Sequence, residues 1–111
     1  MLVYHRTTAA AAQSIQTHGF LDGLADYGSG RARAGVLFTE SPSDEQDGAR
    51  GDAVLTVELI GEDRHSLLEF AWADPDHRLD PSQCSEWIIP AEFVNRRAVI
   101  VQVDVREPTH W

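Results

Sequence analysis

Hydrophobic and polar residues alternate most regularly in "AVLTVELI", residues 53–60. Leu55, Val57 and Leu59 fall on one side, and Val54, Thr56, Glu58 and Ile60 fall on the other. This alternation predicts a half-buried strand. Shorter apolar runs predict strands at residues 2–5, 35–40, 66–72 and 86–89. A longer strand is expected at residues 97–105, with Val99, Val101, Val103 and Val105 on one face.

One segment has the signals of a helix. Thr7 or Thr8 can cap a helix over residues 9–18, and Gly19 is its expected end. Ala12 and Ile15, with Phe20 just beyond, would then face a core. Residues 21–34, 41–52 and 73–83 have the Gly, Pro, Ser and Asp content of loops. Five or six strands and one clear helix predict the α+β class, as a single domain over residues 1–111.

Composition and charge narrow the functional classes. Nine basic residues against eighteen acidic ones give a formal net charge of −9, which opposes non-specific binding to nucleic acid or anionic lipid. No apolar run is long enough to span a bilayer. The single cysteine, Cys84, cannot form an internal disulfide, so a cytoplasmic location is expected. Apart from His5, the histidines are His18, His65, His77 and His110, and they show no metal-ligand spacing.

The stretch "YHRTT", residues 4–8, is the first candidate for chemistry. His5 ends a predicted strand, and the turn into the helix leaves backbone N–H groups available to a ligand. The alternative is that His5 is a polar strand-end residue whose hydrogen bonds are satisfied locally. In "GVLFTES", residues 35–41, Leu37 and Phe38 are ordinary strand core by default, although Phe38 could line a pocket.

Glu86 is the third candidate, because it heads the apolar run "EWIIP". A carboxylate there is usually solvated, but desolvation beside Trp87 and Ile88 would strengthen its electrostatic effect. Cys84 lies two residues earlier. No base neighbours Cys84 in the sequence, so structural burial is the favoured interpretation over a nucleophile.

Taken in order, "YHRT" before a helix that ends in "HGF", then "GVLFTE", then a strand opening "EWIIP" resemble the motifs of the ADP-ribosyltransferase superfamily. The resemblance is to the branch shared by poly(ADP-ribose) polymerases and diphtheria toxin. It implies a compact fold of two small, mostly antiparallel sheets with one main N-terminal helix. It also implies NAD as the substrate and no metal.

The resemblance implies a role for each matching residue. His5 would hydrogen-bond a ribose hydroxyl of NAD, the backbone of Arg6 would hold the nicotinamide carboxamide, and Thr7 would brace the turn. Glu86 would bind the 2′-hydroxyl of the nicotinamide ribose. Loss of nicotinamide passes through an oxocarbenium-like state, so a fixed carboxylate stabilises the transition state more than the ground state.

The sequence also departs from the family pattern. Leu37 stands where a tyrosine normally packs against nicotinamide, and Tyr27 or Trp87 could substitute for it. Arg6 replaces a glycine and adds a cation that could meet a phosphate of NAD. Cys84 stands where related enzymes often have Glu or Gln, which leaves the acceptor open.

The resemblance therefore implies a mono-ADP-ribosyltransferase acting on a protein or a small molecule, in an undetermined oligomeric state. One alternative is a non-catalytic binding module with the same fold. Others are an NAD glycohydrolase and an RNA 2′-phosphotransferase. The phosphotransferase would need a basic phosphate pocket, for which the candidates are Arg6, Arg31, Arg33, Arg96 and Arg97.

Overall fold

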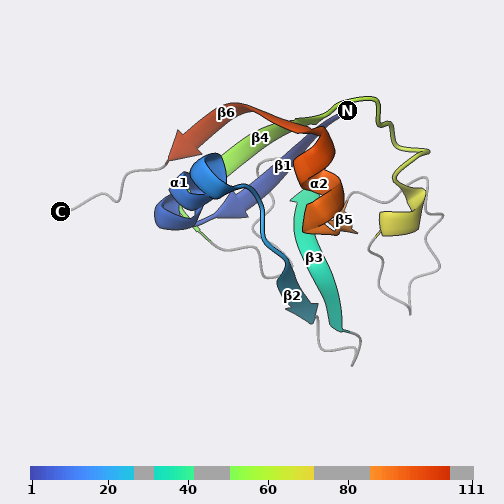
Figure 1. Cartoon of the computed structure of the whole chain (residues 1–111), viewed down its shortest axis with the longest axis horizontal. Coiled ribbons are helices and arrows are strands. Elements are labelled where there is room, and N and C mark those ends of the chain that lie inside the picture. Colours follow the sequence, from blue (N-terminus) through green and yellow to red (C-terminus); the bar gives the residue numbers. More distant parts are fainter. Residues whose placement is uncertain (27–31, 42–50, 72–85, 106–111) are drawn as a thin grey trace.

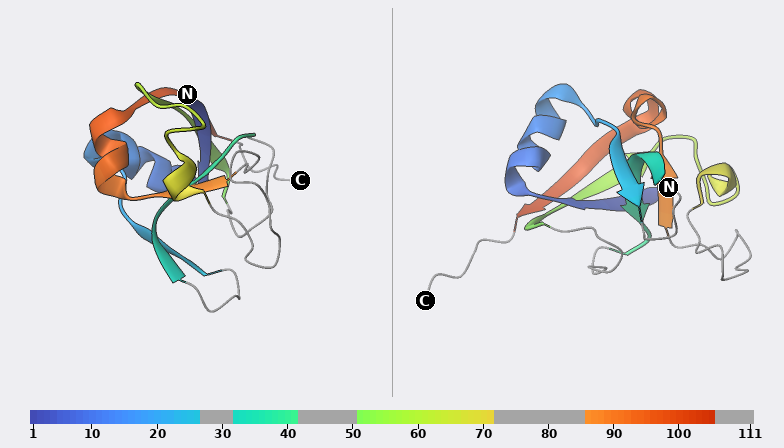
Figure 2. Two further views of the ribbon diagram at one scale, coloured as in Figure 1. Left: turned by 90° about the vertical axis from the view of Figure 1, so that its right-hand side faces the viewer. Right: turned by 90° about the horizontal axis from the view of Figure 1, so that it is seen from below.

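The computed structural model describes residues 1–26, 32–41, 51–71 and 86–105 (Figure 1). Its six strands form one antiparallel sheet: β1 (Leu2–Thr7), β2 (Gly23–Asp26), β3 (Ala32–Thr39), β4 (Ala53–Leu59), β5 (Glu86–Ile89) and β6 (Ala98–Val105). The order is β2-β3-β1-β4-β6, and β5 pairs with β3. The helices α1 (Ala9–His18) and α2 (Ala91–Arg97) lie on the same side of the sheet (Figure 2). The predicted α+β class is confirmed.

The two halves of the sheet meet at β1. This strand pairs with β4 along its whole length, but it pairs with β3 only where Tyr4 lies opposite Thr39. On the far side of β3 are β5 and β2, which pair with successive parts of that strand. We predicted two small sheets, whereas the described strands form one connected sheet with a narrow junction.

The core forms where the predicted apolar faces meet the helices. In β4, Leu55, Val57 and Leu59 are fully buried while the alternate residues are partly exposed, as predicted. Ala12 and Phe20 are also buried, and the pattern of α1 is confirmed. Its N-cap is Thr8, whose hydroxyl accepts a hydrogen bond from the backbone N–H of Ala11 at 3.1 Å.

Two segments that we predicted to be strand or loop have other structures. Of the strand predicted at residues 66–72, the described residues 66–71 form none, because Asp63 and Ser66 exchange side-chain and backbone hydrogen bonds and turn the chain into a 3₁₀-helix, η1 (Leu68–Phe70). Within residues 21–34, β2 and the start of β3 form an antiparallel pair instead of a loop. The second helix, α2, was not predicted. Its apolar pattern is only one i, i+3 pair, the buried Ala91 and Val94.

The prediction that the four valines of β6 lie on one face is also wrong. Thr56 pairs with Gln102 but Val57 pairs with Ile100, so Val101 is an extra residue that forms a β-bulge. The bulge interrupts the alternation, and Val99 and Val101 are half-exposed while Ile100 packs against the core.

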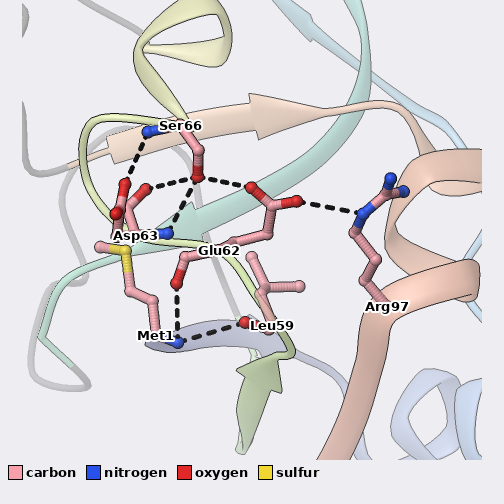
Figure 3. A network of polar contacts seen from close by, with 6 residues as sticks. All are labelled: Met1, Leu59, Glu62, Asp63, Ser66 and Arg97. Atoms are coloured by element: carbon pink, nitrogen blue, oxygen red, sulfur yellow. Dashed lines mark hydrogen bonds and ion pairs between the residues drawn. The ribbon is translucent and has the colours of Figure 1, made fainter.

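A polar network ties the start of β1 to the end of α2 (Figure 3). The Met1 ammonium donates to the carbonyl oxygens of Leu59 and Glu62, at 3.2 and 3.1 Å. The Glu62 carboxylate in turn lies 3.0 Å from the guanidinium of Arg97 and accepts from the hydroxyl of Ser66. The turn after β4 is thereby fixed to both neighbouring elements.

Gly51 lies against the backbone of β1. Its φ is +148°, and a Cβ built on it would be 2.0 Å from the carbonyl oxygen of Thr7, whereas Gly61 has φ +77° and nothing within 4 Å. We expect Gly61→Ala to lower the free energy of unfolding by about 1–2 kcal/mol through backbone strain. Gly51→Ala should lower it by more than about 3 kcal/mol, because the chain must also separate from β1. Urea unfolding of both variants tests this, and equal losses would contradict it.

Candidate functional site

His5 lies on the core side of β1, close to the junction with β3. Its Nδ1 is 2.7 Å from the carbonyl oxygen of Leu37, and its ring centroid is 5.8 Å from those of both Phe20 and Phe38. A carbonyl oxygen can only accept, so Nδ1 carries the proton and Nε2 is left as an acceptor in the neutral ring. Burial lowers the pKa of His5, and the hydrogen bond to Leu37 opposes this shift without reversing it.

In the turn between β1 and α1, side chains of the protein accept from two of the backbone N–H groups that the helix start leaves unpaired. The backbone N–H of Ala9 donates to the Asp52 carboxylate at 2.8 Å, and those of Ala11 and Ala12 donate to the side chain and carbonyl of Thr8. The bond of Ala12 is the first regular one of the helix, so our prediction that the unpaired N–H groups of the turn would be available to a ligand is wrong for two of them, those of Ala9 and Ala11. Asp52 also adds negative charge, which disfavours a phosphate at this helix end.

Arg6 and Thr7 both contact Gly51. The guanidinium of Arg6 donates to the carbonyl oxygen of Gly51 at 3.2 Å, and the carbonyl of Thr7 lies against the same glycine. These contacts hold the end of β1 in place, and the Arg6 guanidinium binds the backbone of the protein itself.

Glu86 is the first residue of β5 and is only 9% exposed. It lies opposite Thr39 of β3, which lies opposite Tyr4 of β1. Directly opposed residues project from the same face of a sheet, so Glu86, Thr39 and Tyr4 form a row across three adjacent strands. The Thr39 hydroxyl donates to the carbonyl oxygen of Ser41 at 2.8 Å.

The predicted site residues divide between the two faces. Leu37 lies opposite Ile88, two residues from Thr39, so it shares the face of Glu86. His5 follows Tyr4 and therefore projects to the opposite face, where it contacts Phe38. The structure thus brings the three motif strands together, but it does not bring the His5 and Glu86 side chains onto one face.

Tyr4 is the member of this row that was not predicted as a site residue. Nothing in "LVYH" indicates which residue of another strand lies opposite it. Of the two substitutes proposed for the missing tyrosine, Trp87 is fully buried on the core side, opposite Phe38, and Tyr27 lies outside the described residues. Cys84, His77 and His110 lie outside them as well.

The basic residues considered for a phosphate site are engaged elsewhere or not described. Arg96 forms an exposed ion pair with Glu92 at 2.7 Å, and Arg97 pairs with Glu62 and stacks on Phe93 at 4.1 Å from the ring centroid. Arg31 and the side chain of Arg33 lie outside the described residues. The described basic side chains therefore do not form the cluster that a phosphotransferase would need.

Comparisons of the chain with models of protein families, with curated proteins and with solved structures find no match. Among the described residues, no three His, Cys, Asp or Glu side chains gather as a metal site would require. No helix in this part of the chain is long and apolar enough to cross a membrane. Functional inference therefore depends on the three motifs and their arrangement.

The lowered pKa of His5 predicts that the fold is sensitive to acid. The unfolded chain takes up a proton on His5 near pH 6.5, while the folded chain takes it up only at lower pH. The free energy of unfolding should therefore fall below about pH 6.5, by up to about 1.4 kcal/mol per pH unit, until the folded pKa is reached. Substitution His5→Asn keeps a donor for Leu37 and should make this decline shallower.

Urea unfolding of wild type and His5→Asn between pH 5 and 8 measures this effect. His18→Asn is the matched control, because His18 is exposed at the end of α1. An acid decline in His5→Asn as steep as that of wild type would show that the His5 imidazole does not cause it.

Proposed function

We propose that this protein is a mono-ADP-ribosyltransferase, which cleaves nicotinamide from NAD and transfers one ADP-ribose unit to a protein or a small molecule. One observation carries the proposal. The three short motifs, which are separated by 30 to 50 residues in the sequence, lie on adjacent strands β1, β3 and β5, with Glu86, Thr39 and Tyr4 in one row. Such convergence is expected of motifs that serve one site.

Glu86 is the residue to which we assign the chemistry. In the reaction, the bond between the ribose C1′ and the pyridinium nitrogen breaks, and its electron pair leaves with neutral nicotinamide. Positive charge then develops on the ribose, which a carboxylate held near the 2′-hydroxyl stabilises. Because Glu86 is 9% exposed, its field is less screened than that of a surface carboxylate. The acceptor attacks C1′ and loses a proton.

His5 contributes to this site by position. Its hydrogen bond to the Leu37 carbonyl holds β3 two residues before Thr39, next to the row that contains Glu86. We therefore revise its expected role from a ribose contact to a positioning residue, because its ring lies on the opposite face.

The alternatives differ in what they predict for NAD. An NAD glycohydrolase would use the same Glu86 but give ADP-ribose to water, and a binding module would release no nicotinamide. An RNA 2′-phosphotransferase is disfavoured, because Arg96 and Arg97 are engaged in ion pairs and the net charge is −9. The acceptor is better matched by a protein or small molecule than by nucleic acid, and a cytoplasmic location fits a supply of NAD.

We expect Glu86→Gln to lower the kcat for nicotinamide release by roughly a hundredfold to a thousandfold, with a small effect on KM, since it removes charge stabilisation of the transition state. Glu92→Gln is the control, because Glu92 is exposed and pairs with Arg96. Chromatography measures the release of nicotinamide from labelled NAD, in the presence and absence of cell extract.

Label on an extract component would support transfer, and free ADP-ribose alone would support the glycohydrolase. Wild type that neither releases nicotinamide nor binds NAD would contradict both enzymatic functions. Equal rates for Glu86→Gln and wild type would contradict the role of Glu86.

A further inference from the structure

Arg64 contacts both strands of the β3–β5 pair at the end that contains Glu86. Its guanidinium forms an ion pair with the Glu40 carboxylate and lies 5.8 Å from the centroid of the Trp87 ring. Glu40 directly follows Thr39 in the chain, and Trp87 directly follows Glu86. Because Thr39 and Glu86 lie opposite each other, Arg64 contacts the chain neighbour of each member of this pair.

β5 is a short strand that needs support at this end. It has four residues, and in the described part of the chain it pairs with β3 and, through a single bridge from Trp87, with Ala71. Glu86 is its first residue, and the ends of an element open more readily than its centre. A contact that joins the two strands here therefore limits the movement of Glu86.

The tryptophan at position 87 is better explained by a contact with a cation than by a hydrogen bond. Trp87 is fully buried on the core side, and its indole Nε1 has no hydrogen-bond partner in the described part of the chain. A buried donor without a partner is unfavourable, and phenylalanine would avoid it. An indole does offer the most favourable aromatic face for a guanidinium, and Arg64 lies over that face.

The turn that carries Arg64 is itself held in place. Asp63 and Ser66 exchange hydrogen bonds across it, at 2.7 and 2.9 Å. The preceding residue, Glu62, forms an ion pair with Arg97 at 3.0 Å (Figure 3). Arg64 therefore extends from a fixed backbone, which allows its guanidinium to hold β3 and β5 in position.

We infer that Arg64 is a positioning residue, which clamps the ends of β3 and β5 and so holds the Glu86 carboxylate in place. The kinetic part of this inference rests on the proposed function. Arg64 contacts the Trp87 ring on the face of the sheet opposite to the Glu86 side chain, so its effect on Glu86 passes through the backbone of β5. A carboxylate displaced by about 1 Å would stabilise the charge that develops on the ribose less well, which lowers kcat.

Hydrogen exchange, measured by mass spectrometry, tests the clamp independently of activity. Arg64→Gln removes the charge that both contacts require, and it should speed exchange of the amides of residues 86–89 roughly three- to thirtyfold while those of β4 stay unchanged. Arg96→Gln is the matched control, because Arg96 forms an exposed ion pair with Glu92 on α2. Equal exchange at residues 86–89 in the two variants would overturn the inference.

Kinetic measurements test the connection to Glu86. Arg64→Gln should lower kcat for nicotinamide release roughly tenfold with little change in KM, and Arg64→Lys, which keeps the charge, should recover part of this loss. In a Glu86→Gln background, Arg64→Gln should not lower kcat further, because the carboxylate through which Arg64 acts has been removed. Urea unfolding verifies that each variant folds.

The outcomes separate the inference from the proposed function. An unchanged kcat in Arg64→Gln would overturn the action of Arg64 on Glu86, and so would a fall of the same size in the Glu86→Gln background. Wild type that releases no nicotinamide would overturn the proposed function, and hydrogen exchange would still decide whether Arg64 holds β5. Faster exchange at residues 86–89, together with a lower kcat that depends on Glu86, is the expected result.

Discussion

The hydrogen bond from His5 to the Leu37 carbonyl lies where the two halves of the sheet join. β1 and β3 pair directly only at Tyr4 and Thr39, and both β2 and β5 are attached through β3. The imidazole donates across this narrow junction and so adds a second link, while its burial lowers its pKa. In the sequence His5 resembles a ligand-binding histidine, but in the structure its side chain links β1 to β3.

Polar side chains provide matching links on the helical side. The amide of Asn95 in α2 both donates to and accepts from the backbone of Phe20, at 2.9 and 2.8 Å, and Asp22 accepts from the N–H of Ala91 at 2.8 Å. These contacts explain Gly19, because a Cβ there would be 2.9 Å from the Asn95 side-chain oxygen. Buried backbone groups left without such partners would cost about 1–3 kcal/mol each.

Local sequence patterns predicted the elements that are long or capped. They failed where contacts with residues distant in the sequence determine the structure. The first helix, with Thr8 and Gly19 at its ends, and the alternating strand β4 follow from their own residues. The seven-residue α2 shows less than two turns of pattern, and the bulge at Val101 depends on pairing with β4. The candidate site shows the same limit: the motif positions are visible in the sequence, but which residues share a face with Glu86 depends on the register of β1, β3 and β5.

The bulge in β6 has a consequence for how copies of the protein meet. In the described part of the chain, β6 is at the end of the sheet and carries the half-exposed Val99, Val101 and Val105, a sequence that could otherwise template another strand. The extra residue bends the strand and breaks its regular spacing of N–H and C=O groups. A flat edge strand could pair with the same strand of another copy and so form fibres, whereas the bulge in β6 opposes such pairing. The net charge of −9 on each copy adds repulsion between copies.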